Sequence, residues 1–157
     1  MTEVVSRGSL PDRDLRWLTA CETLAPLFST CAKRQYVAFV IGSTGRVVGF
    51  GYNGTPAGHP HCADAPCPRL SADVEPGSRY DAGPGRCLAV HAEANALLYS
   101  DSMSRVGATL YVNGPPCPDC AKLIVAAGVV RVVHRADDRY RDACRPLGLE
   151  TVTVAAL

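Results

Sequence analysis

The sequence predicts an α/β protein in which helices pack on a mixed, five-stranded sheet. With 157 residues, 47% of them hydrophobic and 20% charged, the chain has the size and apolar content of one globular domain, here taken as residues 1–157. Short β-rich runs alternate with helical patterns in the order helix, strand, strand, long loop, then three helix–strand pairs. This order is typical of helices that cover a sheet.

The first helix and a strand hairpin are expected in the amino-terminal third. Apolar residues recur near helical spacing between about residues 13 and 30, namely Leu15, Leu18, Cys21, Ala25 and Phe28. Pro26 should kink or divide this helix. The β-rich runs 36–41 and 46–50 flank a turn that contains Gly42 and Gly45, which predicts two antiparallel strands.

The second half of the chain alternates helices with strands. Helices are expected at 91–100, at 118–127 with an end at Gly128, and at about 138–146. Strands are expected at 108–112, 129–133 and 149–154. Each strand follows or precedes a helix closely, so these pairs should build one continuous sheet.

A long loop rich in cysteine and histidine separates the two halves, at about residues 54–87. Residues 54–85 hold five of the 14 glycines and six of the 12 prolines, with little periodicity. A structureless loop of this length is uncommon in a compact domain unless it is functional or held by additional bonds. The loop is therefore expected to contribute to function.

Charge and hydropathy exclude several classes of protein. The formal net charge of +1 is too small to hold a long nucleic acid, so none is expected as a partner. No apolar run reaches the roughly 18 residues of a membrane span, so no membrane association is expected. Residues 1–9 show neither a basic region nor an apolar stretch typical of a secretory signal, which predicts a cytoplasmic protein.

Eight cysteines in a chain without an export signal favour metal binding or catalysis over disulfides. Cys21 and Cys144 lie in apolar helical surroundings and are expected to be small core residues. Of the remaining six, Cys62, Cys67 and Cys87 lie in the predicted loop, Cys31 lies shortly before the first predicted strand, and Cys117 and Cys120 form a Cys-x-x-Cys motif.

Two short motifs place potential metal ligands at the starts of two predicted helices. His91-Ala92-Glu93 begins one helix, and Cys117-Pro118-Asp119-Cys120 begins the next. Pro115-Pro116 disfavours helix before Cys117, whereas Pro118 suits a first helical turn. Cys117 should therefore be at about the N-cap, with Cys120 one turn further on. A helix N-terminus favours thiolates, the form of cysteine that binds metal.

His91, Cys117 and Cys120 are accordingly predicted to bind a zinc ion. Three protein ligands leave one tetrahedral position open to water, as in catalytic zinc sites. Glu93 lies two residues after His91, roughly 200° around a regular helix, and so is badly placed as a fourth ligand. It is predicted to act as the general acid and base. The order H-x-E followed by P-C-x-x-C matches the signature of zinc deaminases.

The chain resembles the cytidine deaminase superfamily, and within it the deoxycytidylate (dCMP) deaminases. The resemblance covers about residues 13–135 and rests on four segments: Cys31-Ala32-Lys33-Arg34, Gly51-Tyr52-Asn53-Gly54-Thr55-Pro56-Ala57-Gly58, His91-Ala92-Glu93-Ala94-Asn95-Ala96-Leu97 and Pro116-Cys117-Pro118-Asp119-Cys120. It implies a three-layer α/β/α cytidine deaminase-like fold. It also implies a homo-oligomer, a dimer or a hexamer, with dCTP and dTTP as effectors.

The resemblance further implies which residues contact a small pyrimidine nucleotide. Asn53 would contact the sugar, its loop with Gly54 would bind phosphate or an effector, and Asn95 would shape the site. For the phosphate, Arg34 is a candidate from the sequence, as is one of five arginines near the carboxyl terminus: Arg131, Arg135, Arg139, Arg141 and Arg145. Some members of the family hold a second, structural zinc near the substrate loop.

That second zinc has six candidate ligands in this chain: His59, His61, Cys62, Cys67, Cys87 and Cys31. Four nitrogen or sulfur ligands would hold in place a loop that cannot bury a core of its own. The spacing does not say which four close the site. The alternative is that these are free thiols on a loop.

The predicted function is zinc-dependent hydrolytic deamination of a cytosine nucleotide, dCMP to dUMP and ammonia. Water would attack C4 of the ring while Glu93 moves protons between the water, N3 and the departing amine. Three alternatives remain open. The substrate could be free cytidine or deoxycytidine, a modified cytosine nucleotide or another amino-heterocycle. It could be tRNA or single-stranded DNA, although these need a basic path for the backbone. Finally, the chain could be a non-catalytic zinc-binding or thiol-redox module, for which Glu93 would have no use.

Overall fold

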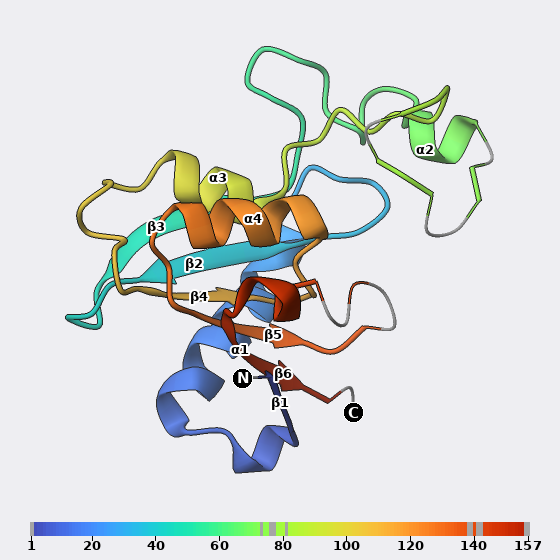
Figure 1. Ribbon diagram of the computed structural model, residues 1–157. Coiled ribbons are helices and arrows are strands. Elements are labelled where there is room, and N and C mark those ends of the chain that lie inside the picture. Colours follow the sequence, from blue (N-terminus) through green and yellow to red (C-terminus); the bar gives the residue numbers. More distant parts are fainter. Residues whose placement is uncertain are drawn as a thin grey trace.

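A mixed sheet of six strands forms the centre of the structure (Figure 1), in the order β1-β6-β5-β4-β2-β3. The computed structural model describes residues 2–72, 74–75, 78–80, 82–137, 140 and 143–155. Four neighbouring strands run parallel, and β2 is antiparallel to both β4 and β3. The strands are β1 (Thr2–Val5), β2 (Val37–Ile41), β3 (Val47–Tyr52), β4 (Thr109–Val112), β5 (Arg131–Arg135) and β6 (Glu150–Val154).

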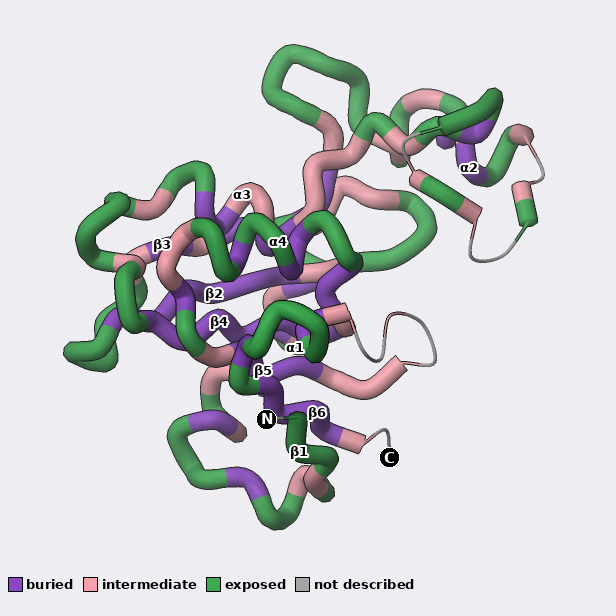
Figure 2. The backbone as a smooth tube through the Cα atoms, viewed as in Figure 1, coloured by how far each residue is buried: buried purple, intermediate pink, exposed green. Residues whose placement is uncertain are grey.

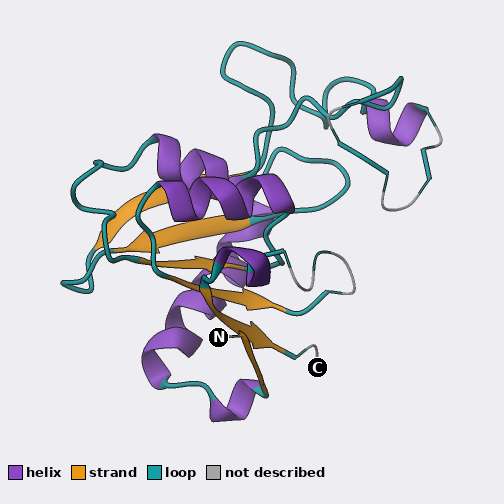
Figure 3. Ribbon diagram, in the orientation of Figure 1, coloured by secondary structure: helices purple, strands orange, loops and turns teal. Residues whose placement is uncertain are grey.

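Helices cover both faces of this sheet (Figure 3). α3 (Ala92–Leu98) and α4 (Pro118–Ala126) lie on one face, and α1 (Asp12–Phe28) lies on the other. Two short 3-10 helices, Arg7–Ser9 and Arg145–Leu147, complete the elements around the sheet. The three layers are those of the predicted α/β/α fold.

The two helical layers enclose two separate apolar clusters because side chains alternate along each strand. In β2, Ala38 and Val40 pack in the cluster formed with α3 and α4, whereas Val37, Phe39 and Ile41 pack in the cluster formed with α1. All five residues are buried. Figure 2 shows this burial along the central strands, which is typical of a sheet covered on both faces.

The α3 helix lies unusually close to β3 because β3 carries two glycines. A Cβ at Gly51 would meet the backbone of Ala92 and Ala96, and one at Gly49 would meet the carbonyl oxygen of Ala96. Only glycine allows so close an approach of helix to strand. This contact determines where the start of α3, with His91 and Glu93, lies above the sheet.

The prediction of an α/β protein with a mixed sheet is confirmed, but the prediction of five strands is wrong by one. The additional strand, β1, pairs in parallel with β6 at the sheet edge. Its residues are largely exposed, so the amino terminus has no apolar periodicity that could indicate a strand. β5 also begins two residues later than expected, at Arg131 rather than at position 129.

Pro26 was expected to kink or divide the first helix, and the division is wrong, since α1 is one helix of 17 residues that ends at Phe28. Pro26 lies in the last turn, where the loss of one backbone donor removes little of the helix. Of the helix expected at 138–146, residues 138, 139, 141 and 142 are outside the described residues. None of the described helices has both the length and the apolar character that a membrane crossing requires.

The Cys/His-rich loop extends away from the sheet (Figure 1) and holds one short described helix, α2 (Pro68–Ser71). The loop is closed at its base by a bridge between Gly54 and Val90. The Gly54 N–H donates to the Val90 carbonyl at 3.2 Å, and the Val90 N–H donates back at 2.8 Å. The two ends of the loop therefore lie side by side, directly before His91.

Candidate active site

His91 and Glu93 occupy the start of α3. His91 is the N-cap residue, with extended backbone (φ −72°, ψ 152°), and the helix proper begins at Ala92. The ring of Tyr80 stands perpendicular to the imidazole of His91, with 5.6 Å between the ring centroids. This edge contact and the cap position together orient the imidazole toward α4.

Cys117 and Cys120 occupy the start of α4 as predicted. Cys117 is the N-cap, Pro118 is the first helical residue, and the backbone N–H of Cys120 donates to the Cys117 sulfur at 3.4 Å. Both thiols are buried. Because one helical turn separates them, the two sulfurs face the same point in front of the helix.

The structure brings His91, Cys117 and Cys120 together. Both sulfurs lie 3.4 Å from Nδ1 of His91, and the three ligand atoms all lie within 4.8 Å of one another. Tetrahedral zinc, at about 2.3 Å from sulfur and about 2.0 Å from nitrogen, holds such atoms roughly 3.5 Å apart. These three residues therefore fit a zinc ion. Within the described residues, no other group of three potential ligands lies so close together.

The pKa values of the two thiols indicate that a cation can bind beside them. The pKa of the Cys117 thiol is lowered to about 4, chiefly by a hydrogen bond from Cys120 and also by His91. The pKa of Cys120 is raised, because its proton is held by Cys117 and because its side chain is buried. Without a metal ion, Cys117 and Cys120 together carry one negative charge. A bound cation would stabilise the thiolate form of both.

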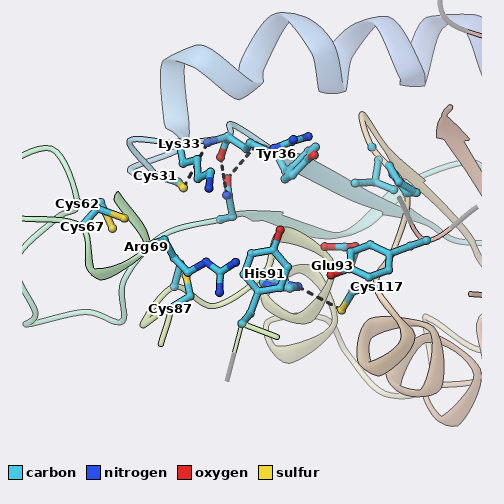
Figure 4. A pocket seen from close by; sticks show the side chains of 18 residues that line it. Cys31, Lys33, Tyr36, Cys62, Cys67, Arg69, Cys87, His91, Glu93 and Cys117 are labelled. Carbon is cyan, nitrogen blue, oxygen red and sulfur yellow. Dashed lines mark hydrogen bonds between the residues drawn. The ribbon is translucent and has the colours of Figure 1, made fainter. Parts of the chain in front are cut away.

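Glu93 lies beside this cluster and is only 5% exposed. Burial raises the pKa of Glu93 to about 7, against the opposing effect of the nearby His91. Glu93, His91 and Cys117 line one pocket, together with Val112, Gly114 and Pro115 from the sheet edge and the turn before α4 (Figure 4). The arrangement can therefore bring a flat substrate against a metal ion and a carboxyl group at once.

Among the residues expected to contact substrate, Asn53 lines this pocket and is 6% exposed. Its Oδ1 accepts hydrogen bonds from Ser29 Oγ (2.6 Å) and the Tyr36 N–H (2.8 Å). Its Nδ2 donates to the Arg34 carbonyl oxygen at 2.7 Å. The Asn53 amide thus holds the end of α1 and the start of β2 together at the pocket wall.

Gly54 and Asn95 line a different cavity, between the beginning of the Cys/His-rich loop and α3. Asn95 Nδ2 donates to the Tyr52 carbonyl oxygen at 2.7 Å. A Cβ at Gly54 would meet the hydroxyl of Thr30. The structure therefore does not bring Gly54 or Asn95 together with His91 and Glu93 in the pocket.

The candidate arginines differ in whether they line the pocket. Arg34 lines the pocket, and its Nη1 donates to Asp137 at 2.9 Å. Arg131 pairs with Asp14 and Glu150, and Arg135 pairs with Glu22, so both stabilise the α1 side of the sheet. Arg145, in the last 3-10 helix, does not line the pocket, and Arg139 and Arg141 are outside the described residues.

The second Cys/His cluster is only partly assembled. The sulfur-bearing residues Cys31, Cys62, Cys67 and Cys87 line the same pocket as His91 (Figure 4). His59 and His61 line the other cavity instead. Burial raises the pKa of both Cys62 and Cys87, and the neighbouring thiols raise it further.

Several residues of the pocket were not expected from the sequence, among them Tyr80 and Arg69. Tyr80 and Arg69 come from the Cys/His-rich loop, which shows neither helical nor strand periodicity. The expectation that Cys21 and Cys144 are core residues is confirmed, since both are buried. All eight cysteines are free thiols.

A His-x-Glu at one helix start and a Cys-x-x-Cys at the next, on a three-layer α/β/α fold, define the class of zinc deaminases. Comparison with known proteins narrows this class. Residues 11–136 match the family described as the cytidine and deoxycytidylate deaminase zinc-binding region. The chain belongs to this family.

Individual relatives agree with the assignment. The deoxycytidylate deaminase of Mycobacterium phage D29 is 47% identical over 127 residues, which is 80% of this chain and 96% of that protein. The human deoxycytidylate deaminase is 37% identical over 110 residues, 69% of this chain and 56% of the human one. The crystal structure of dCMP deaminase from the cyanophage S-TIM5 with dCMP and dUMP has a TM-score of 0.71 at 29% identity, covering 92% of this chain and 98% of that chain.

Proposed function

We propose that this protein converts dCMP to dUMP and ammonia. The observation that carries the proposal is one pocket that joins the His91, Cys117 and Cys120 cluster to the buried carboxyl group of Glu93. Relatives named deoxycytidylate deaminase, one of them similar over almost its whole length, support dCMP as the substrate.

His91, Cys117 and Cys120 would hold the zinc ion in this pocket. When bound, zinc lowers the pKa of water and so supplies a nucleophile at neutral pH. The perpendicular ring of Tyr80 keeps the His91 imidazole in its orientation. Val112 and Ala89 contribute apolar wall, which keeps bulk water from the base.

Glu93 would move the protons of the reaction. Its carboxylate accepts a proton from the attacking water and delivers a proton to N3 of cytosine. As the C4–N4 bond breaks, Glu93 takes the proton of the new C4 hydroxyl group and passes it to the departing amine, so that a C4=O bond replaces the C4–N4 bond and ammonia leaves. Glu93 is only 5% exposed, so little solvent competes with the substrate for its carboxyl group.

The experiment is the turnover of dCMP, dCTP, deoxycytidine and cytidine, measured side by side with zinc-loaded protein. We expect the largest kcat/KM for dCMP. Faster turnover of either nucleoside would overturn the nucleotide assignment. No turnover of any of the four by protein that contains zinc would overturn the enzymatic assignment.

We also propose a second, structural zinc bound by Cys31, Cys62, Cys67 and Cys87. These four residues line one pocket, and Cys31 and Cys67 are close enough to add to the rise that burial causes in the pKa of Cys62 and Cys87. No three of them lie as close together as His91, Cys117 and Cys120, so the loop would tighten when the metal binds. His59 and His61 face another cavity, which favours the four-cysteine set.

Metal analysis tests this set. Two zinc ions per wild-type chain are expected, and one in Cys67→Ser, with the remaining ion at His91, Cys117 and Cys120. His61→Ala is the control and should keep both ions. One zinc per wild-type chain would contradict the second site and leave the first untouched, since the two sites share no ligand. A loss of zinc in His61→Ala would show that a histidine belongs to the set.

We further propose that the cavity lined by Gly54, Asn95, His59 and His61 binds the effectors dCTP and dTTP. The hydroxyls of Thr30 and Thr55 are buried in this region without a hydrogen-bond partner, and both residues line the cavity. Polar groups buried in this way are ready to bind a ligand. A dCMP saturation curve that dCTP does not shift and dTTP does not lower would contradict this proposal.

We infer that the chain forms a homo-oligomer, a dimer or a hexamer. Exposed apolar residues at the end of α3 and just after it support an oligomer. They are Leu98 (70% exposed), Tyr99 (75%) and Met103 (79%). Apolar side chains gathered at a surface mark interaction sites. Light scattering of the purified chain tests the inference, and a monomer at micromolar concentration would contradict it.

We infer, finally, that residues 1–157 fold as one domain in a reducing compartment such as the cytoplasm. Both apolar clusters pack on opposite faces of the same sheet, which supports a single cooperative unit. Eight free thiols, two of them in the candidate metal site, support a reducing location. Two separate unfolding transitions of the zinc-loaded protein would contradict the single domain.

A further inference from the structure

Arg69 is a buried cation in the wall of the reaction pocket. It lies on α2, in the Cys/His-rich loop, and is 5% exposed. It lines the same pocket as His91 and Glu93. Figure 4 shows its guanidinium between the Cys87 thiol and the His91 ring. An arginine is seldom buried to this extent unless an anion accompanies it.

Within the part of the chain that the structure describes, the contacts of Arg69 hold its position but do not compensate its charge. Nη1 donates to the Arg79 carbonyl oxygen at 2.7 Å, and Nη2 donates to the carbonyl oxygen and Oγ of Ser78 at 3.2 and 2.8 Å. These are neutral acceptors. Nε is buried without a hydrogen-bond partner. Among the described residues, no carboxylate pairs with this guanidinium.

The distance from the catalytic cluster suits the far end of a nucleotide. The guanidinium carbon lies 4.7 Å from the centroid of the Tyr80 ring, and that ring lies 5.6 Å from the ring of His91. Arg69 is thus one aromatic ring away from the residue proposed to hold the metal. In a nucleotide, the 5′-phosphate is separated from the reacting base by one sugar ring.

The other cations of the pocket differ from Arg69. Arg34 is exposed and its charge is paired with Asp137. Lys33 lines the pocket but is exposed, so water screens its charge. A planar guanidinium away from water binds phosphate oxygens more strongly than either.

We propose that Arg69 binds the 5′-phosphate of the substrate and so selects a nucleotide over a nucleoside. The proposal rests on the deaminase function above and adds the residue that sets its substrate class. Nε, the donor without a partner, donates to the phosphate, while Ser78 and Arg79 keep the guanidinium oriented. The Cys/His-rich loop thereby supplies the pocket with its phosphate-binding group.

The test compares Arg69→Gln with wild type on two substrates that differ by the phosphate. For each protein, kcat/KM is measured with dCMP and with deoxycytidine, and the ratio of the two is the selectivity. We expect Arg69→Gln to lower this ratio by about 10- to 100-fold, mainly through KM for dCMP, because a charged hydrogen-bond donor is lost. Turnover of deoxycytidine should fall much less.

Two further variants separate charge from loop structure. Arg86→Gln removes the same charge from an exposed position of the same loop, and should leave the ratio at its wild-type value. Arg69→Lys keeps the charge but cannot reach both Ser78 and Arg79. We expect it to retain a ratio within about 10-fold of wild type. If Arg69→Gln fails to fold, a ratio in Arg69→Lys equal to that of wild type would overturn the proposal, because an ammonium group binds phosphate less strongly than a planar guanidinium.

The comparison of dCMP with deoxycytidine separates a phosphate contact of Arg69 from a purely structural role. Equal losses on dCMP and deoxycytidine would show that Arg69 only holds the loop, which overturns the proposal while the deaminase function stands. An unchanged ratio in Arg69→Gln would overturn it as well. A wild-type protein with no activity on dCMP would overturn the proposed function first, before any variant is compared.

Discussion

His91 and Glu93 are only two residues apart, and the boundary of α3 gives them different surroundings. His91 lies outside the helix in extended backbone, so its ring reaches across to the sulfurs at the start of α4. Glu93 lies inside the helix and its side chain is buried next to the pocket. The angle of roughly 200° between His91 and Glu93 that the sequence predicts assumes that both residues are helical. This assumption was wrong, because His91 is the N-cap residue.

Glu93→Gln should keep the zinc at His91, Cys117 and Cys120 and lose most of the activity. Gln matches the size of Glu but cannot carry the proton. A general acid–base group contributes about 10²–10⁴-fold, so kcat should fall by at least that much. Zinc content and dCMP turnover are measured on the same preparation.

Cys117→Ser is the matched comparison, because it removes a proposed ligand rather than the proton carrier. It should lose both the ion at this site and the activity. If Glu93→Gln lost its zinc, or if Cys117→Ser kept zinc at this site and wild-type turnover, the roles assigned to these residues would be reversed or wrong.

The sequence could predict these four residues because their signals are local. A cap position, a proline after the cap and a spacing of three residues are properties of a few neighbouring residues, and Cys117 and Cys120 lie as they predict. Arg69 and Tyr80 could not be found in this way. Their positions depend on contacts such as the packing of Arg69 on Tyr80 and of Tyr80 on His91, which no periodic pattern records.

Elements were predictable to the extent that they are buried. β2, with all residues buried, lies within the predicted run, whereas β1, with mostly exposed residues, was missed. β1 exists because β6 offers an unpaired edge with which its backbone can pair. A strand stabilised chiefly by backbone hydrogen bonds has no side-chain pattern from which it could be predicted.

Gly51→Ala tests how closely α3 depends on β3. The added methyl group would meet the backbone of Ala92 and Ala96, so α3 must move away from the strand. We expect a loss of about 1–3 kcal/mol in the free energy of unfolding, with weaker zinc binding because His91 is displaced. Urea denaturation and zinc titration measure the two effects.

Gly8→Ala is the control for this variant, since its methyl group would meet nothing within 4 Å. The free energy of unfolding should then change by no more than about 0.5 kcal/mol. A Gly51→Ala protein as stable as the Gly8→Ala protein would show that α3 tolerates displacement.

At the scale of the whole molecule, one buried network joins α1 to the sheet. Asp14 of α1 accepts hydrogen bonds from Arg131 of β5, at 2.7 and 3.1 Å, and from the hydroxyl of Tyr111 of β4, at 2.6 Å. Burial would raise the pKa of Asp14, but the hydrogen bonds and the charge of Arg131 outweigh burial and lower the pKa. The ionised carboxylate is therefore favoured in the folded protein.

Asp14→Asn should accordingly destabilise the fold in a pH-dependent way. An aspartate in an unfolded chain has a pKa of about 3.9, and that of folded Asp14 is lower. Its stabilisation is thus fully present above about pH 4 and is lost as the pH falls through the folded-state pKa. At pH 7 we expect a loss of about 3 kcal/mol relative to wild type, with a smaller gap at pH 3.

Urea denaturation at both pH values measures this gap. Asp12→Asn changes an exposed carboxylate in the same helical turn and should leave the free energy of unfolding nearly unchanged at both pH values. A gap for Asp14→Asn that is the same at pH 3 and pH 7 would contradict the assigned role of the charge.

The bridge between Gly54 and Val90 has a consequence for how this protein can vary. The chain leaves the three-layer fold and returns to it at one hydrogen-bonded pair, Gly54 and Val90. The entropic cost of closing the segment between them therefore depends only weakly on its length. Insertions and deletions within that segment therefore leave α3, α4 and the sheet in place. The proposed zinc ligands and Glu93 lie outside this segment, whereas Arg69 lies within it. Changes to the segment that spare Tyr80 would therefore alter the proposed phosphate contact and leave the proposed catalytic groups in place.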